Sequence, residues 1–128
     1  MTDAPIKPFF IYTTRGDWMA TLIGTQIFDT RGEYVGYIAG PERSVYTRDG
    51  EWVGDMSKDG RILRKRAAQR RPLQEKLPPK PAGKPSNLPP RAPLPPQMAE
   101  LRYDTIDVLE EEEDIFKRLS DRRKDLGE

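Results

Sequence analysis

The 128-residue chain contains no cysteine and no histidine, and these absences exclude several kinds of chemistry. Without cysteine there are no disulfides, thiolate metal ligands or thiol nucleophiles. Without histidine the chain lacks the commonest metal ligand and general base. The sequence also has no nucleophile elbow of the Gly-x-Ser-x-Gly type and no phosphate-binding loop. We therefore expect no enzymatic activity, no metal site and no cofactor.

Long apolar runs are also missing. No run approaches the 18 residues that a membrane-spanning helix requires, and the N-terminus shows no basic start followed by an apolar stretch. These two observations predict a cytoplasmic protein without a membrane span. Hydrophobic residues make up 35% of the chain and charged residues 34%, which is a low apolar share for a chain packed along its whole length.

The composition changes near residue 65. Nine of the 11 aromatic residues lie in 1–60, whereas ten of the 13 prolines lie in 72–96. This change predicts three parts: a β-hairpin repeat domain over 5–65, a basic and Pro-rich disordered linker over 66–97, and a charged helical tail over 98–128. A domain of this size buries only about 60% of its unfolded surface, so we expect marginal stability or a homo-oligomer.

One short pattern occurs three times in the first half of the chain, in Ile11–Leu22, Ile27–Ile38 and Val45–Met56. Each copy has a β-branched residue, an aromatic residue, a glycine, an acidic residue, a second aromatic residue, a small residue and an aliphatic residue in the same order. A pattern repeated at such short spacing indicates one supersecondary unit used several times.

The unit is typical of a β-hairpin. Its glycine lies where a two-residue turn needs a positive φ, and Asp59-Gly60 supplies a fourth turn before a strand over 61–64. The acidic residue after each turn is interpreted as part of the turn rather than as a catalytic carboxylate. The four predicted turn glycines are Gly16, Gly32, Gly50 and Gly60. The predicted aromatic pairs across the strands are Tyr12–Trp18, Phe28–Tyr34 and Tyr46–Trp52.

The second and third copies of the repeat resemble the 4-fold beta flower domain of bacterial proteins. The motif Phe28-Asp29-x-x-Gly32-Glu33-Tyr34-Val35-Gly36 carries the resemblance, and 46–54 follows it closely. The resemblance covers residues 5–65. It implies an all-β domain in which four hairpins close into a pseudo-fourfold, flower-like or barrel-like ring, with no established activity. Because the fourth unit is fragmentary, we expect Phe9–Tyr12 to complete it by pairing with Ile62–Leu63.

The second half of the chain contains three distinct segments. Residues 61–71 include six basic groups and no acidic one, and 72–96 is a Pro-rich stretch that favours the polyproline II conformation. Two P-x-x-P motifs, at 90–93 and 93–96, could dock into an aromatic groove, but we interpret the stretch as a spacer. Residues from Val108 to Leu126 are predicted to form an α-helix.

These patterns favour a non-catalytic protein-interaction or assembly module with an unknown protein partner. Two alternatives stay open: electrostatic binding of nucleic acid through residues 61–71, and binding of a small ligand at the centre of the hairpin ring. Tyr37 is predicted to face solvent, because Thr21 and Asp55 occupy its column of the repeat. The candidate contact residues are Tyr37, Arg64, Lys65, Arg66, Arg70 and Arg71.

Overall fold

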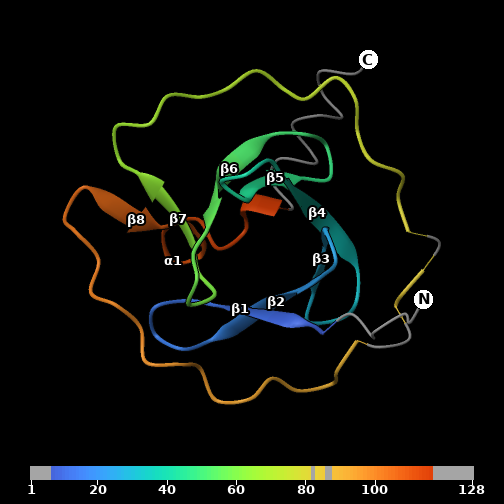
Figure 1. Cartoon of the computed structure of the whole chain (residues 1–128), viewed down its shortest axis with the longest axis horizontal. Coiled ribbons are helices and arrows are strands. Elements are labelled where there is room, and N and C mark those ends of the chain that lie inside the picture. The colour runs from blue at the N-terminus through green and yellow to red at the C-terminus, as the bar shows by residue number, and fades with distance from the viewer. Residues whose placement is uncertain (1–6, 82, 86–87, 117–128) are drawn as a thin grey trace.

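The computed structural model describes residues 7–81, 83–85 and 88–116. Its eight strands form one antiparallel sheet in which every strand pairs with the next along the chain. The sheet is curled, so that successive hairpins lie around a common centre (Figure 1). The strands are β1 (Phe9–Tyr12), β2 (Trp18–Ile23), β3 (Gln26–Asp29), β4 (Tyr34–Ala39), β5 (Ser44–Thr47), β6 (Trp52–Met56), β7 (Ile62–Lys65) and β8 (Thr105–Asp107), followed by the short helix α1 (Val108–Glu111).

The register of the first three hairpins confirms the pairing predicted from the repeat. Tyr12 lies opposite Trp18, Phe28 opposite Tyr34 and Tyr46 opposite Trp52. At each of these pairs the register shifts, so that one residue of the second strand has no direct partner. Such an extra residue is a β-bulge, which bends the strand and increases its twist. The bulged residues are Met19, Val35 and Val53.

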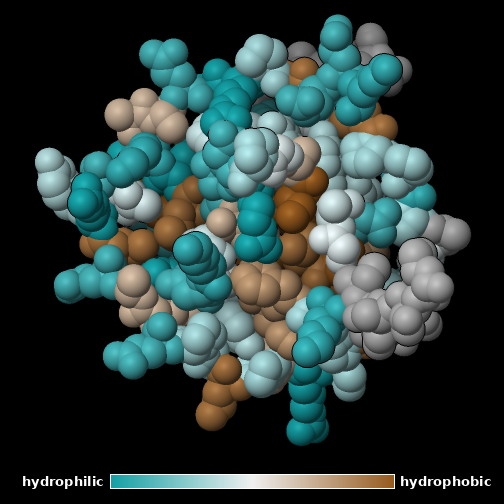
Figure 2. All heavy atoms as spheres, in the orientation of Figure 1, coloured by the Kyte–Doolittle hydropathy of each residue, from teal (hydrophilic) through white to brown (hydrophobic). Residues whose placement is uncertain are grey.

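Alternation along the strands separates aliphatic from aromatic side chains. The β-branched residue before each first aromatic belongs to the main core, and the aromatic next to it points to the opposite face of the sheet. The pairs concerned are Ile11–Tyr12, Ile27–Phe28 and Val45–Tyr46. Figure 2 shows apolar side chains in the middle of one face of the molecule and hydrophilic ones around most of its edge.

Four turns of the sheet share one hydrogen-bond pattern. The amide of the first turn residue donates to the carbonyl four residues later, and the glycine amide donates back to the carbonyl of the first residue. The four glycines have φ between 89° and 96°, as predicted. Each turn spans five residues rather than the two expected, and its first side chain accepts a hydrogen bond from the fifth residue's amide. The turns are 13–17, 29–33, 47–51 and 57–61.

The fourth hairpin is completed from the far end of the chain. β7 pairs with β8, with Leu63 opposite Asp107, rather than with the N-terminal strand as expected. β1 approaches this region through one backbone bond, in which the Tyr12 amide donates to the Gly60 carbonyl at 2.8 Å. The sheet therefore extends beyond residue 65 and incorporates residues that were expected to belong to a helical tail.

The C-terminal part differs from the predicted helix over Val108–Leu126. The helix begins at Val108 as predicted, but α1 ends at Glu111. The chain turns at Glu113–Asp114, and helical backbone resumes at Ile115–Phe116, where the described residues end. Val108, Leu109 and Ile115 are buried in the main core, so this segment packs into the concave side of the sheet. Burial of these side chains against the sheet accompanies the interruption of the helix after Glu111. Residues 117–128 of the prediction lie outside the described residues.

The connection between β7 and β8, residues 66–104, travels around the outside of the sheet (Figure 1), and we call it the belt. It contains no helix and no strand within the described residues, in keeping with its proline content. It nevertheless contacts the hairpin turns one after another. Leu77 lies against Gly50, Leu88 against Gly32 and Pro95 against Gly16. The absence of a Cβ at these glycines permits the close approach.

Candidate functional site

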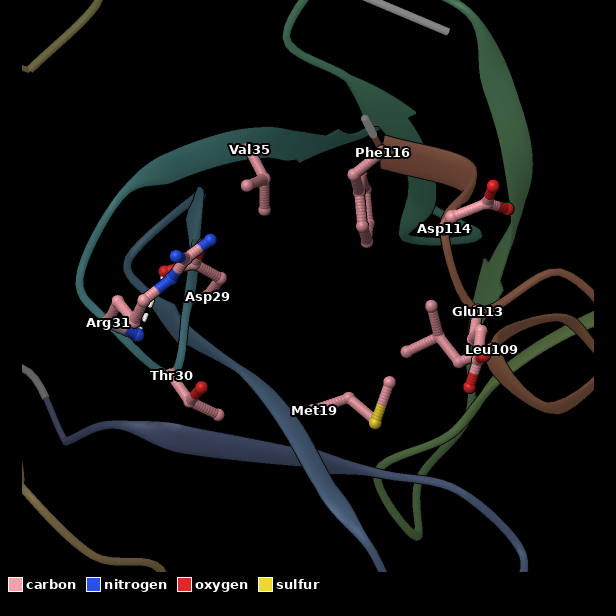
Figure 3. Close-up of a pocket in the computed structure, with 9 residues that line it drawn as sticks. All are labelled: Met19, Asp29, Thr30, Arg31, Val35, Leu109, Glu113, Asp114 and Phe116. Carbon is pink, nitrogen blue, oxygen red and sulfur yellow. Dashed lines mark hydrogen bonds and ion pairs between the residues drawn. The ribbon is translucent and has the colours of Figure 1, made fainter. Parts of the chain in front are cut away.

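A groove of about 470 Å³ lies between the first two hairpins and the C-terminal segment (Figure 3). Met19 of β2 and Val35 of β4 form one side, and Leu109 and Phe116 of the C-terminal segment form the other. Charged and polar side chains complete the lining. They are Asp29, Thr30, Arg31, Glu113 and Asp114.

The bulges explain why apolar side chains line this groove. Met19 and Val35 are the extra residues of their strands and point into the cavity in Figure 3. The equivalent residue of the third hairpin, Val53, is fully buried in the core. The bulge of the third hairpin is therefore part of the core, whereas the first two bulges lie beside an open space.

The small residue after each bulge allows the sheet to pack closely. A Cβ at Gly36 would lie 2.3 Å from the Tyr46 carbonyl oxygen and 3.1 Å from Cε1 of Phe116. A Cβ at Gly54 would meet the Leu63 carbonyl oxygen at 2.7 Å and Val108 at 3.2 Å. The contacts at both glycines are therefore with the next strand's backbone and with the C-terminal segment.

One end of the groove is held by the second hairpin turn. Oδ1 of Asp29 accepts hydrogen bonds from the amides of Arg31 and Glu33, both at 2.9 Å. The Arg31 guanidinium lies 3.9 Å from Asp29 and 3.7 Å from Glu33, and its side chain is 66% exposed. The turn is therefore rigid at its backbone while it presents a solvated cation to the groove.

Tyr37 is buried, which corrects the prediction that it faces solvent. It is 5% exposed and stacks on Tyr46, directly opposite in β5, with ring centroids 5.2 Å apart. Trp52 completes this cluster, and the Arg71 guanidinium lies 3.8 Å from the centroid of the Trp52 ring. Burial, with smaller contributions from Tyr46 and Tyr34, raises the pKa of Tyr37 to about 12. The position of Tyr37 in the repeat gave a wrong prediction of its exposure, because a small aromatic cluster on the outer face of the sheet is also shielded from solvent.

The predicted basic contact residues do not form a single open cluster. Each of the five makes a contact within the chain. Arg64 pairs with Glu112 at 2.6 Å, Lys65 with Asp104 at 3.1 Å and Arg70 with Glu51 at 3.7 Å. Arg66 donates from Nε to the Tyr103 carbonyl at 2.7 Å, and Arg71 covers Trp52. These contacts attach both ends of the belt to the sheet.

Arg61 forms the centre of a buried polar network that was not predicted from the sequence. It is 1% exposed, and its guanidinium donates to Asp59, to Oγ1 of Thr14 at 3.0 Å and to the Ala99 carbonyl at 2.8 Å. Thr14 in turn donates from its amide and hydroxyl to Asp107, both at 2.7 Å. The network connects the first turn, the fourth turn, the belt and β8. Its sequence signal is the basic residue at the turn position where the other three copies have an acid.

The carboxyl of Asp59 responds to this arrangement. Its burial alone raises the pKa, but hydrogen bonds from Arg61 and Ser57, the Arg61 charge and the Ala99 amide outweigh burial. The net result is a pKa below the ordinary value of an aspartate. The ion pair, with atoms 2.6 Å apart, is thus a structural clamp.

The acidic residues of the repeat lie at the turns, and they are Asp17, Glu33 and Glu51. The backbone amide of each donates a hydrogen bond to the side chain of the first turn residue. In the described part of the chain, no three His, Cys, Asp or Glu side chains gather as a metal ion would need. No helix among the described residues combines the length and apolar character needed to cross a membrane.

Tandem antiparallel hairpins with glycine turns, curled into one sheet, define a small all-β repeat protein. The sequence matches the family described as 4-fold beta flower protein over residues 3–102. The chain belongs to this family. The match includes the belt as well as the hairpins, so the family's domain reaches well past residue 65. No curated protein and no solved structure shows a significant match to the chain.

Proposed function

We propose that this chain is a non-catalytic protein-interaction module whose groove receives an apolar side chain of a protein partner. The observation that carries the proposal is the pair of bulged residues, Met19 and Val35, lining an open space of about 470 Å³. β-Bulges are enriched beside functional sites, where they redirect side chains. Apolar surface left open at a concave site is a common feature of binding sites.

The charged lining favours a protein segment over an anionic polymer. Arg31 lies on one side of the groove and Glu113 and Asp114 on the other, so both signs of charge are present (Figure 3). A partner that inserts an apolar residue flanked by charges of both signs would be complementary to this lining. A partner of uniform negative charge would meet the two carboxylates.

The two alternatives have less support. Nucleic-acid binding needs cations free to contact phosphates, and the candidate basic residues contact carboxylates, a carbonyl and Trp52 instead. Small-ligand binding at the centre of the hairpins needs space that the core residues Val108, Leu109 and Ile115 occupy. A small ligand in the groove itself is an outcome that the following experiment separates.

The test compares the full chain with Met19→Lys, which places a charge in the groove. Proteins captured by the wild-type chain from host lysate are purified, and their affinity is measured by calorimetry. We expect Met19→Lys to weaken binding about tenfold or more, as loss of a central apolar anchor does. The exposed variant Lys80→Ala is the matched control and keeps the affinity.

Equal affinity of wild type and Met19→Lys for the captured protein would overturn the proposal. Failure of the wild type to capture any protein, combined with a Met19→Lys-sensitive thermal shift in a metabolite library, would assign the groove to a small ligand instead. The urea midpoint of Met19→Lys is measured in parallel, and an unchanged midpoint attributes the loss to the groove rather than to unfolding.

We also propose that the four hairpins form a closed ring with pseudo-fourfold symmetry. The support is the hydrogen-bond pattern shared by the turns of the first three hairpins and by the turn that leads into β7, together with the Tyr12–Gly60 backbone bond. Cytoplasmic location and self-association stay predictions of the sequence.

A further inference from the structure

The belt carries a second feature, which goes beyond the proposed groove and rests on different residues. Between 91 and 101, every third side chain is half-buried and the two between are exposed. A period of three is that of a polyproline II helix, which has three residues per turn. The half-buried residues are Ala92, Pro95, Met98 and Leu101.

The inward edge of this segment is fixed to the first hairpin. Pro95 lies 3.2 Å from the position of a Cβ on Gly16, and the Tyr12 hydroxyl donates to the Pro93 carbonyl at 2.6 Å. Arg61 holds the Ala99 carbonyl at 2.8 Å. The backbone of the segment is thus anchored at several points, which lowers the conformational entropy that a partner must remove on binding.

The two outward edges present apolar residues to solvent. Pro93 and Pro96 share one edge, and Leu94 lies on the other with 92% of its surface exposed. A polyproline II helix is triangular in section, and grooves that bind it grip two of its edges between aromatic rings. Anchoring one edge to the sheet leaves two edges available.

We propose that residues 93–97 form a docking ridge for a partner domain with an aromatic-lined groove that binds polyproline II segments. The ridge has the apolar exposure, the period and the preorganised backbone that such a groove recognises. A further P-x-x-P sequence of the belt, Pro78-Pro79-Lys80-Pro81, supplies a contrast within the same chain. Its two spaced prolines, Pro78 and Pro81, are half-buried, so it is not expected to dock.

The test uses a WW domain as the probe, because its groove holds a polyproline II segment between two aromatic side chains. The probe is titrated to millimolar concentration into the full chain labelled with ¹⁵N and ¹³C. We expect saturable chemical-shift changes confined to Leu94, Gln97 and their neighbours, with no change at Pro79–Lys80. A dissociation constant of about 0.1–1 mM is sufficient support.

Variants separate docking from unspecific contact. Leu94→Ser and Pro96→Ala alter only exposed side chains, so the fold persists, which the spectrum of the sheet amides checks directly. Combined in one chain, they should abolish the shift changes, whereas Pro79→Ala should leave them unchanged. Absence of saturable changes at Leu94 and Gln97, or equal changes in the double variant, would overturn the proposal.

Discussion

Replacing Arg61 by alanine tests the network that joins both ends of the sheet to the belt. The guanidinium is 1% exposed and donates four hydrogen bonds, two to Asp59, one to Thr14 and one to the Ala99 carbonyl. Removing one partner of a buried ion pair costs about 3–5 kcal/mol, because the other charge and its neighbours lose their partners. Asp59 retains 18% exposure, so water compensates part of this loss. We therefore expect a loss of about 3 kcal/mol in the free energy of unfolding.

The measurement is urea unfolding followed by the fluorescence of Trp18 and Trp52. A loss of this size is a large share of the about 5–15 kcal/mol that stabilises a typical domain, so the midpoint should fall steeply. Arg102→Ala is the matched control, because Arg102 is exposed. Its free energy of unfolding should differ from that of the wild type by less than about 0.5 kcal/mol. A midpoint of Arg61→Ala within error of wild type would refute the role given to this network.

Three further predictions follow from local geometry. Gly36→Ala should destabilise the chain by about 2–3 kcal/mol, since the new Cβ would lie 2.3 Å from the Tyr46 carbonyl oxygen, whereas Gly83→Ala, with nothing within 4 Å, should not; equal urea midpoints would contradict this. The pKa of Tyr37 rises from 10.0 in the unfolded chain to about 12 in the fold, so its contribution to the free energy of unfolding is fully present below pH 10 and declines as pH rises towards 12. Alkaline unfolding that Tyr37→Phe leaves unchanged would refute this prediction. The pKa of Asp59 is lowered in the fold, so this carboxylate stabilises the fold at pH values above its unfolded pKa of 3.8, and the contribution is lost as pH falls below that value. Acid unfolding should therefore be less steep in Asp59→Asn, and an identical acid profile would contradict the prediction.

The hairpins could be predicted because their signals are local. A glycine with positive φ and an aromatic pair across each turn are properties of adjacent residues, and the register reproduces all three predicted pairs. The bulges follow the same repeat but were not foreseen. The five residues between the two aromatics of a hairpin do not determine how many residues stay unpaired. That number is set only when the two strands twist together.

The fourth hairpin could not be predicted because its strands lie far apart in the sequence. Thr105–Asp107 is too short to show an alternating pattern, and the acidic residues after it favour a helix start. Only the position of the belt, which returns the chain to β7, places these residues beside Leu63. Composition indicated that the belt has no helix or strand, but not that it contacts the turn glycines.

The groove and the buried Tyr37 depend on tertiary packing in the same way. Met19 and Val35 occupy the same position of the repeat as Val53, so the sequence alone predicts the same environment for all three residues. Val53 is buried in the core, whereas Met19 and Val35 lie beside the groove. Tyr37 is buried in a cluster with Tyr46, which lies opposite it, and with Trp52, and its position in the repeat indicates neither neighbour.

Amide hydrogen exchange of the full chain tests most directly whether residues beyond the belt complete the sheet. The account predicts that the hydrogen-bonded amides of β7 and β8 exchange slowly and with protection comparable to those of β5 in the centre of the sheet. Rapid, random-coil exchange over Thr105–Asp107, alongside slow exchange in the first three hairpins, would contradict it.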